Sequence, residues 1–68
     1  MRKIVIKTEY ITLSQFLKLS NIAQSGGEAK FILQTKKILV NGEKDNRKGR
    51  KLYRSDRVLV ENEEFEIC

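Results

Sequence analysis

The sequence predicts an α+β fold in which two short helices pack on a small, mostly antiparallel sheet. Two observations support this prediction. Apolar residues recur at the helical spacing i, i+3, i+4 in two segments of the first half of the chain. In the second half, short β-branched runs alternate with turn signals. With 68 residues, we expect residues 1–68 to form one domain with a thin core.

The N-terminal elements are a strand and a capped helix. Residues 2–7 form a β-branched run flanked by charge, which predicts a strand that leads through residues 8–11 into the first helix. Thr12 is expected to be the N-cap, and Gln15, three residues on, completes a capping box. The helix is expected to end near 19–21, and its apolar stripe consists of Leu13, Phe16 and Leu17.

A second capping signal begins the next helix. Ser25 is the expected N-cap, with Glu28 reaching back to it, and the helix should end near Thr35–Lys36. The core-facing positions at helical spacing are Ala29, Ile32 and Leu33. A different face carries Lys30, Phe31 and Gln34.

The remaining elements are strands and turns. Asn41-Gly42 is a strong hairpin signal, because a type I′ turn needs positive φ at both central residues. It would connect a strand over 38–40 to a return strand over 43–45. The expected elements after this hairpin are a polar loop over 46–51, a Ser55-Asp56 turn, a strand over 57–60, an Asn62-Glu63 turn and a strand over 65–67.

Absent residue types exclude most catalytic classes. The chain has no His, which rules out histidine bases and His-ligated metals, and its one Cys, Cys68, cannot form an internal disulfide. No carboxylate accompanies a plausible nucleophile, so we expect neither an enzyme nor a cofactor. The glutamates at 61–66 either form a solvated face or hold a metal ion, and we expect the solvated face. No apolar run approaches the length of a membrane span, and the start does not resemble a signal peptide. We expect a soluble cytoplasmic protein.

The positive charge is concentrated in one segment. Residues 36–57 hold nine cations and three carboxylates, a net charge of +6, which exceeds the +5 of the whole chain. Residues 61–66 carry four glutamates. The densest point is Arg47-Lys48-Gly49-Arg50-Lys51, followed by Arg54. Such a loop either binds phosphates, with Arg as a bidentate donor, or stays solvated for solubility; mutual repulsion of the cations favours a polyanionic partner.

Two further features have both a structural and a binding interpretation. Ser25-Gly26-Gly27 either caps a helix after a tight turn or leaves backbone N–H groups open to a phosphate. Phe31 and Tyr53 are the aromatic residues most able to lie off the core. Each either packs conventionally or stacks on an unpaired base.

These motifs resemble a known family. Ser25-Gly26-Gly27-Glu28-Ala29-Lys30 followed by Ile38-Leu39-Val40-Asn41-Gly42 resembles the S-four RNA-binding domain, whose fold is called the alpha-L motif. The Arg47–Lys51 loop is similar to that of the free-standing bacterial YaaA and YbcJ type. The resemblance implies binding of structured ribosomal RNA without catalysis.

Departures from the family pattern shift the expected contacts. Gly26 stands where the family often has Arg, Phe31 where it often has a second cation, and Lys36 where a Gly usually ends the helix. We therefore expect Lys36, Lys37 and the loop to compensate. The residues expected to contact RNA are Ser25, Gly26, Gly27, Lys30, Phe31, Gln34, Lys36, Lys37, Arg47, Lys48, Arg50, Lys51, Tyr53 and Arg54.

Two other classes of function compete with RNA binding. The acidic terminal hairpin suits a protein-interaction adaptor linked to ribosome assembly or DNA replication. A DNA-binding module would need a helix for the major groove, and the second helix carries only Lys30 as a cation before Lys36. We expect an RNA partner, no small-molecule substrate, no membrane and a monomer.

Overall fold

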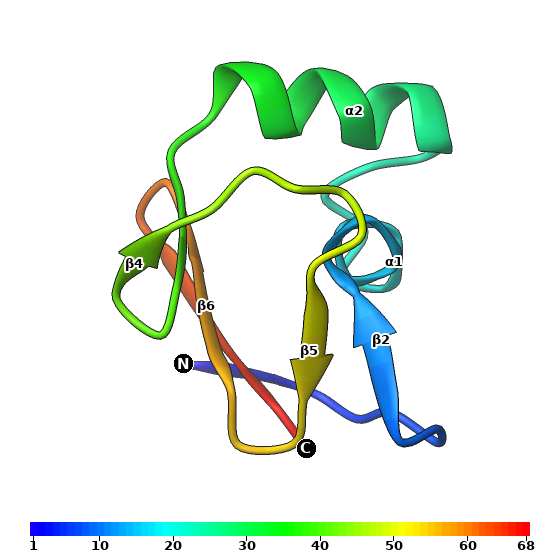
Figure 1. Cartoon of the computed structure of the whole chain (residues 1–68), viewed down its shortest axis with the longest axis vertical. Helices are drawn as coiled ribbons and strands as arrows, with labels where there is room; N and C mark the ends of the chain where they lie inside the picture. Colours follow the sequence, from blue (N-terminus) through cyan, green and yellow to red (C-terminus); the bar gives the residue numbers. More distant parts are fainter.

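The computed structural model describes residues 1–68 and contains seven short strands and two helices (Figure 1). Five strands form one sheet in the order β1-β7-β6-β3-β4, and β2 pairs with β5 in a separate two-stranded ribbon. Only the β1–β7 pair is parallel, so the predicted α+β architecture with a mostly antiparallel sheet is confirmed. The elements are β1 (Arg2–Ile4), β2 (Tyr10–Thr12), α1 (Leu13–Leu19), α2 (Gly26–Thr35), β3 (Ile38–Val40), β4 (Glu43–Lys44), β5 (Lys51–Tyr53), β6 (Arg57–Val60) and β7 (Glu63–Ile67).

Both helices begin at the predicted caps. The Thr12 hydroxyl accepts the Gln15 N–H, and the Gln15 side chain accepts the Thr12 N–H at 2.8 Å, which is the expected capping box. The prediction of a second capping box, at Ser25, is wrong in one detail. Ser25 Oγ accepts the Glu28 N–H as expected, but Glu28 Oε1 accepts the N–H of Gln24, at 2.6 Å, and not that of Ser25.

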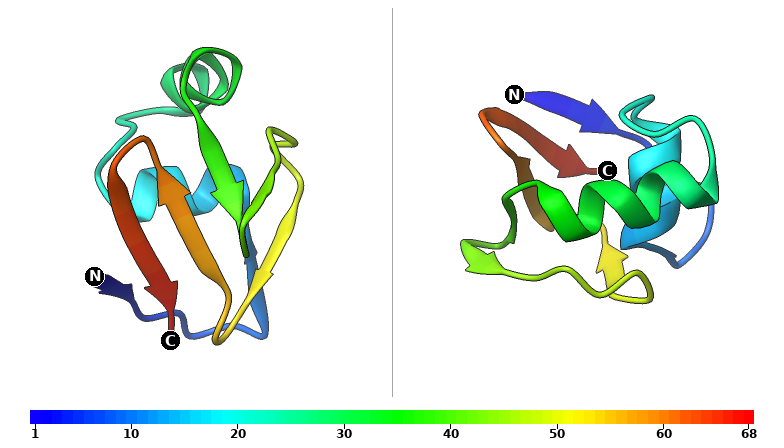
Figure 2. Two further views of the ribbon diagram at one scale, coloured as in Figure 1. Left: turned by 90° about the vertical axis from the view of Figure 1, so that its left-hand side faces the viewer. Right: turned by 90° about the horizontal axis from the view of Figure 1, so that it is seen from above.

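The helices enclose a core on one side of the sheet. Figure 2 shows α1 behind the five-stranded sheet and α2 across one end of it. Sixteen buried apolar residues form one cluster, which includes all six helix positions predicted to face the core. At its centre the ring of Phe16 from α1 meets the ring of Phe65 from β7 edge to face, with centroids 5.1 Å apart. The sheet and α1 therefore share one core.

Several strand boundaries differ from the prediction. β1 ends at Ile4, which pairs with Ile67 on β7, and not at residue 7 as predicted, although Ile6 N–H still donates to the carbonyl of Cys68. β2 and β5 were not predicted: residues 8–11 were expected only to lead into the first helix, and Lys51 was assigned to the polar loop. Each has only three residues, too few to display an alternating pattern.

Two turns hold the hairpins in place. Asn41 and Gly42 have φ of 52° and 86°, as the predicted type I′ turn requires. Asn41 also links this turn to the Ser55-Asp56 turn: its side-chain amide donates to Asp56 at 3.1 Å and accepts the Arg57 N–H at 2.9 Å. The last turn lies at 61–62 rather than 62–63, because Glu61 adopts the positive φ of 54° and Glu63 already pairs with Val60.

Candidate nucleic-acid interface

The basic loop, Arg47–Lys51, is hydrogen-bonded to the start of α1. Figure 1 shows the segment between β4 and β5 running beneath α2 towards α1. The carbonyl of Arg50 accepts the Leu13 N–H at 2.8 Å, and the carbonyl of Lys48 accepts the Ser14 N–H at 3.1 Å. A helix start leaves such N–H groups without partners, and the loop satisfies two of them. The loop is therefore held against a core helix, and its side chains are presented on a fixed backbone.

Asp45 organises the two arginines of the loop. Its carboxylate is 9% exposed and accepts the Nε and Nη2 of Arg47 at 3.1 and 2.8 Å and the Nη1 of Arg50 at 3.2 Å. The hydrogen bond from the Arg47 side chain holds the pKa of Asp45 well below its usual range; the Arg47 N–H and the charges of both arginines add to this effect, and partial burial opposes it. One carboxylate thus fixes two guanidinium groups.

The other cations of this region differ in whether they interact with groups of the fold. Lys48 and Lys51 form no salt bridge, so no carboxylate neutralises either charge, and the Nζ of Lys51 lies over the ring of Tyr10, 4.8 Å from its centroid. Arg54 donates through Nη2 to the carbonyl of Ile6 at 3.0 Å, which ties the β5–β6 turn to the segment after β1. Arg54 is thus partly engaged in holding the fold.

The exposed face of α2 forms a continuous stripe. Gly26, Lys30 and Gln34 are spaced four residues apart, and Phe31 lies beside them; all are exposed. Phe31 is 61% exposed, so of its two interpretations core packing is wrong. Exposing a large aromatic side chain to water is unfavourable, and the exposed ring gains no packing within the chain that would offset this cost.

A groove connects the end of α2 to the start of the basic loop. It has a volume of about 390 Å³ and brings Gln34, Lys36 and Lys37 together with Lys44 and Asn46. Lys44 was not among the predicted contact residues. Its position became apparent only from the β3–β4 pairing, which places it opposite Leu39 and next to the helix end.

The start of α2 has a mixed character. A Cβ added to Gly26 would meet nothing within 4 Å, and one added to Gly27 would meet only Ser25 Oγ at 3.9 Å. Packing within the chain therefore does not require either glycine. The carboxylate of Glu28 lies at the same helix end, however, where its negative charge would repel a phosphate.

A second groove lies on the other side of the loop. It has a volume of about 640 Å³ and is lined by Arg47, Gly49, Arg50, Lys51, Tyr53 and Asp56. Tyr53 is 43% exposed and therefore lies off the core. Tyr10, directly opposite it on β2, was missed by the sequence analysis, because the segment that carries it was not expected to be a strand.

Two of the four glutamates on the acidic hairpin lie beside cations of neighbouring strands. Glu63 forms a salt bridge with Arg2 at 2.6 Å. Glu66 lies in register between Lys3 on β1 and Arg57 on β6. No group of three or more metal-ligating side chains is present, and neither helix has the length and apolar character needed to cross a bilayer.

Comparison with known proteins identifies the family. Residues 4–68 match the S4 domain, which covers nearly the whole chain. A relative from Bacillus subtilis (strain 168), "Probable ribosome maturation protein RlbA", is 59% identical over 58 residues, which are 85% of this chain and 82% of the relative. The resemblance seen in the motifs is confirmed, and the chain belongs to the S4 domain family.

Proposed function

We propose that this protein is a non-catalytic RNA-binding protein that binds structured ribosomal RNA during ribosome maturation. Membership of the S4 domain family and likeness to a protein named for ribosome maturation support the proposal. The observation that carries it is the basic loop, whose backbone is fixed on α1 by two hydrogen bonds and whose arginines are fixed by Asp45. A rigid arrangement of cations lowers the entropy cost of binding a polyanion.

The proposed interface has two parts that fit two phosphate tracts. One is the groove with Lys36, Lys37 and Lys44 at the end of α2. The other is the loop with Lys48 and Lys51 as free cations. Because A-form RNA hides its base edges in a deep, narrow major groove, a protein with cations at fixed spacing recognises the shape of the backbone.

The exposed stripe on α2 lies beside the first part of this interface. Lys30, Phe31 and Gln34 supply a cation, an aromatic face and an amide on one surface. In the proposal the missing side chains at Gly26 and Gly27 let RNA approach the helix start, where Glu28 limits how closely a phosphate can bind. Tyr53 and the two arginines border the second part.

Crosslinking in cells, followed by sequencing of the bound RNA, tests this function. We expect segments of ribosomal RNA or its precursors to be enriched well above the level captured by a small control protein of equal net charge. Enrichment equal to that control would contradict the proposal. Affinity purification of the protein from cell extracts with and without ribonuclease gives a second readout: protein partners that stay bound after complete RNA digestion would favour a protein-interaction adaptor instead.

A further inference from the structure

The exposed face of the β2–β5 ribbon carries an aromatic pair. Tyr10 and Tyr53 stand directly opposite each other in the antiparallel register, with ring centroids 5.7 Å apart and an interplanar angle of 47°. They are 37% and 43% exposed. The next pair in the register, Ile11 and Leu52, points into the core and fixes the ribbon to the molecule. Both rings are therefore held at the surface by a rigid backbone.

Cations adjoin this aromatic face. Lys51, two residues before Tyr53, lies on the same exposed side of β5, and its Nζ lies 4.8 Å from the centroid of the Tyr10 ring. The groove that reaches Tyr53 is also lined by Arg47 and Arg50, which Asp45 holds in place. An aromatic face beside fixed cations matches one nucleotide, since the base can stack on the ring while its phosphate binds the cations.

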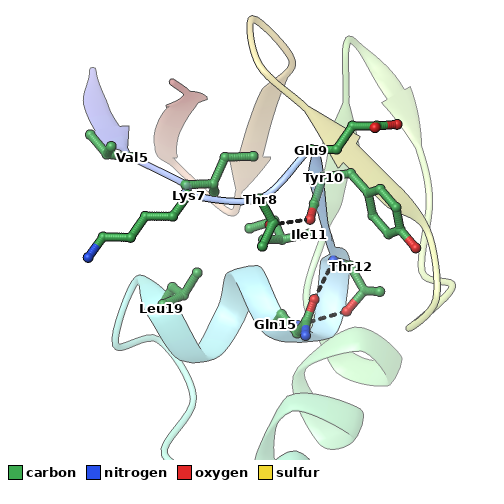
Figure 3. Close-up of a pocket in the computed structure, with 10 residues that line it drawn as sticks. Val5, Lys7, Thr8, Glu9, Tyr10, Ile11, Thr12, Gln15 and Leu19 are labelled. Atoms are coloured by element: carbon green, nitrogen blue, oxygen red, sulfur yellow. Dashed lines mark hydrogen bonds between the residues drawn. The ribbon is translucent and has the colours of Figure 1, made fainter.

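Tyr10 is also one of the residues that line a neighbouring apolar groove. That groove, formed by the β1–β2 connection and α1, is bordered by Val5 and Leu19. In Figure 3 the Tyr10 ring points away from both of these side chains. The ring thus belongs to the surface of Tyr53 and Lys51, which continues the proposed RNA interface.

We propose that the β2–β5 ribbon binds an unpaired RNA base on the rings of Tyr10 and Tyr53, next to the helical segment that the loop contacts. This inference rests on the proposed RNA binding. Bases inside an A-form helix are stacked on each other, so the bound nucleotide comes from a bulge, a loop or a single-stranded end. Stacking depends weakly on sequence, because every base has a π face, and the site is therefore selective for unpaired structure.

Three RNA probes test the proposal: a blunt hairpin, the same hairpin with three unpaired adenosines at its 3′ end, and the same hairpin with three abasic nucleotides there. The abasic probe keeps the added phosphates and removes the bases. We expect the adenosine probe to bind about tenfold more tightly than the abasic probe, which corresponds to about 1.4 kcal/mol. Tyr53→Leu should abolish this difference, and Tyr53→Phe should keep it, because the ring remains.

Tyrosine fluorescence reports the same event without a substitution. The chain has two tyrosines, which are this pair, and no tryptophan, so its tyrosine emission comes from the site itself. We expect the adenosine probe to quench the emission at saturation and the blunt and abasic probes to leave most of it. Equal affinity and equal quenching for adenosine and abasic probes would overturn the stacking site and leave RNA binding intact. Failure of all three probes to bind at low salt would overturn both proposals.

Discussion

Removing two free cations from the basic loop should reduce the salt dependence of RNA binding by a calculable amount. Lys48 and Lys51 lie in the loop region and have no carboxylate partner, so both charges are available to phosphates. The variant Lys48→Gln/Lys51→Gln removes the charges and keeps side chains of similar reach. The backbone bonds that fasten the loop to α1 use carbonyl groups and do not depend on these side chains.

The magnitude follows from counterion release. Each phosphate neutralised contributes about 0.7–0.9 to the slope of log affinity against log salt, so two cations contribute about 1.4–1.8. At 0.1 M salt this corresponds to a loss of about 25- to 60-fold in affinity relative to the wild type, and the loss should shrink towards 1 M salt. Fluorescence anisotropy of a labelled ribosomal RNA fragment over a salt series measures both quantities.

The matched control removes the same charge from another surface. Lys3 is exposed on β1, which Figure 2 shows on the opposite side of the molecule from the basic loop. Lys7 is exposed on the connection that follows β1, and in Figure 3 its side chain points away from the Tyr10 ring. Lys3→Gln/Lys7→Gln has the same net charge as the loop variant, and its slope should stay within experimental error of the wild type. Equal slopes for the two variants would refute the reasoning, because net charge alone would then explain the binding.

Three further predictions concern stability and the α2 surface. Asn41→Ala should lower the free energy of unfolding by about 2 kcal/mol, because alanine disfavours the positive φ and loses the bonds to Asp56 and Arg57; thermal unfolding should show a midpoint lower by roughly 8–16 °C. The pKa of Asp45 is depressed in the folded state, so its carboxylate stabilises the fold above about pH 4, and this stabilisation is lost as the pH falls below that value. Asp45→Asn should therefore flatten the acid side of the stability profile measured by urea unfolding; parallel profiles would contradict this assignment. Phe31→Ser should change stability by less than about 0.5 kcal/mol but weaken RNA binding, and unchanged affinity in a titration would remove Phe31 from the interface.

Elements with local signals were predictable from the sequence. Thr12 and Ser25 begin helices because their side chains accept backbone N–H groups a few residues away, and such contacts are visible in the order of residues. The Asn41-Gly42 turn is also local, since positive φ at both positions selects these residue types. The apolar spacing in each helix similarly identified the residues that face the core.

Features that depend on distant contacts were not predictable. β2 and β5 are strands because they pair with each other across about forty residues of chain, so neither segment shows a pattern alone. Parts of the candidate interface could not be predicted for the same reason. Charge density identified the Arg47–Lys51 loop, but the sequence did not reveal that Asp45 holds both arginines or that Tyr10 stands beside Tyr53. These contacts arise from tertiary pairing.

Mapping of RNA–protein crosslinks by mass spectrometry tests the central claim most directly. Ultraviolet light would be applied to the protein bound to ribosomal RNA, and the crosslinked peptides would be sequenced to locate the attached nucleotides. The proposed interface predicts crosslinks within residues 30–37 and 44–53, the surface formed by α2, the basic loop and β5. Crosslinks confined to β1 and β7, on the opposite side of the molecule from the loop, would contradict it.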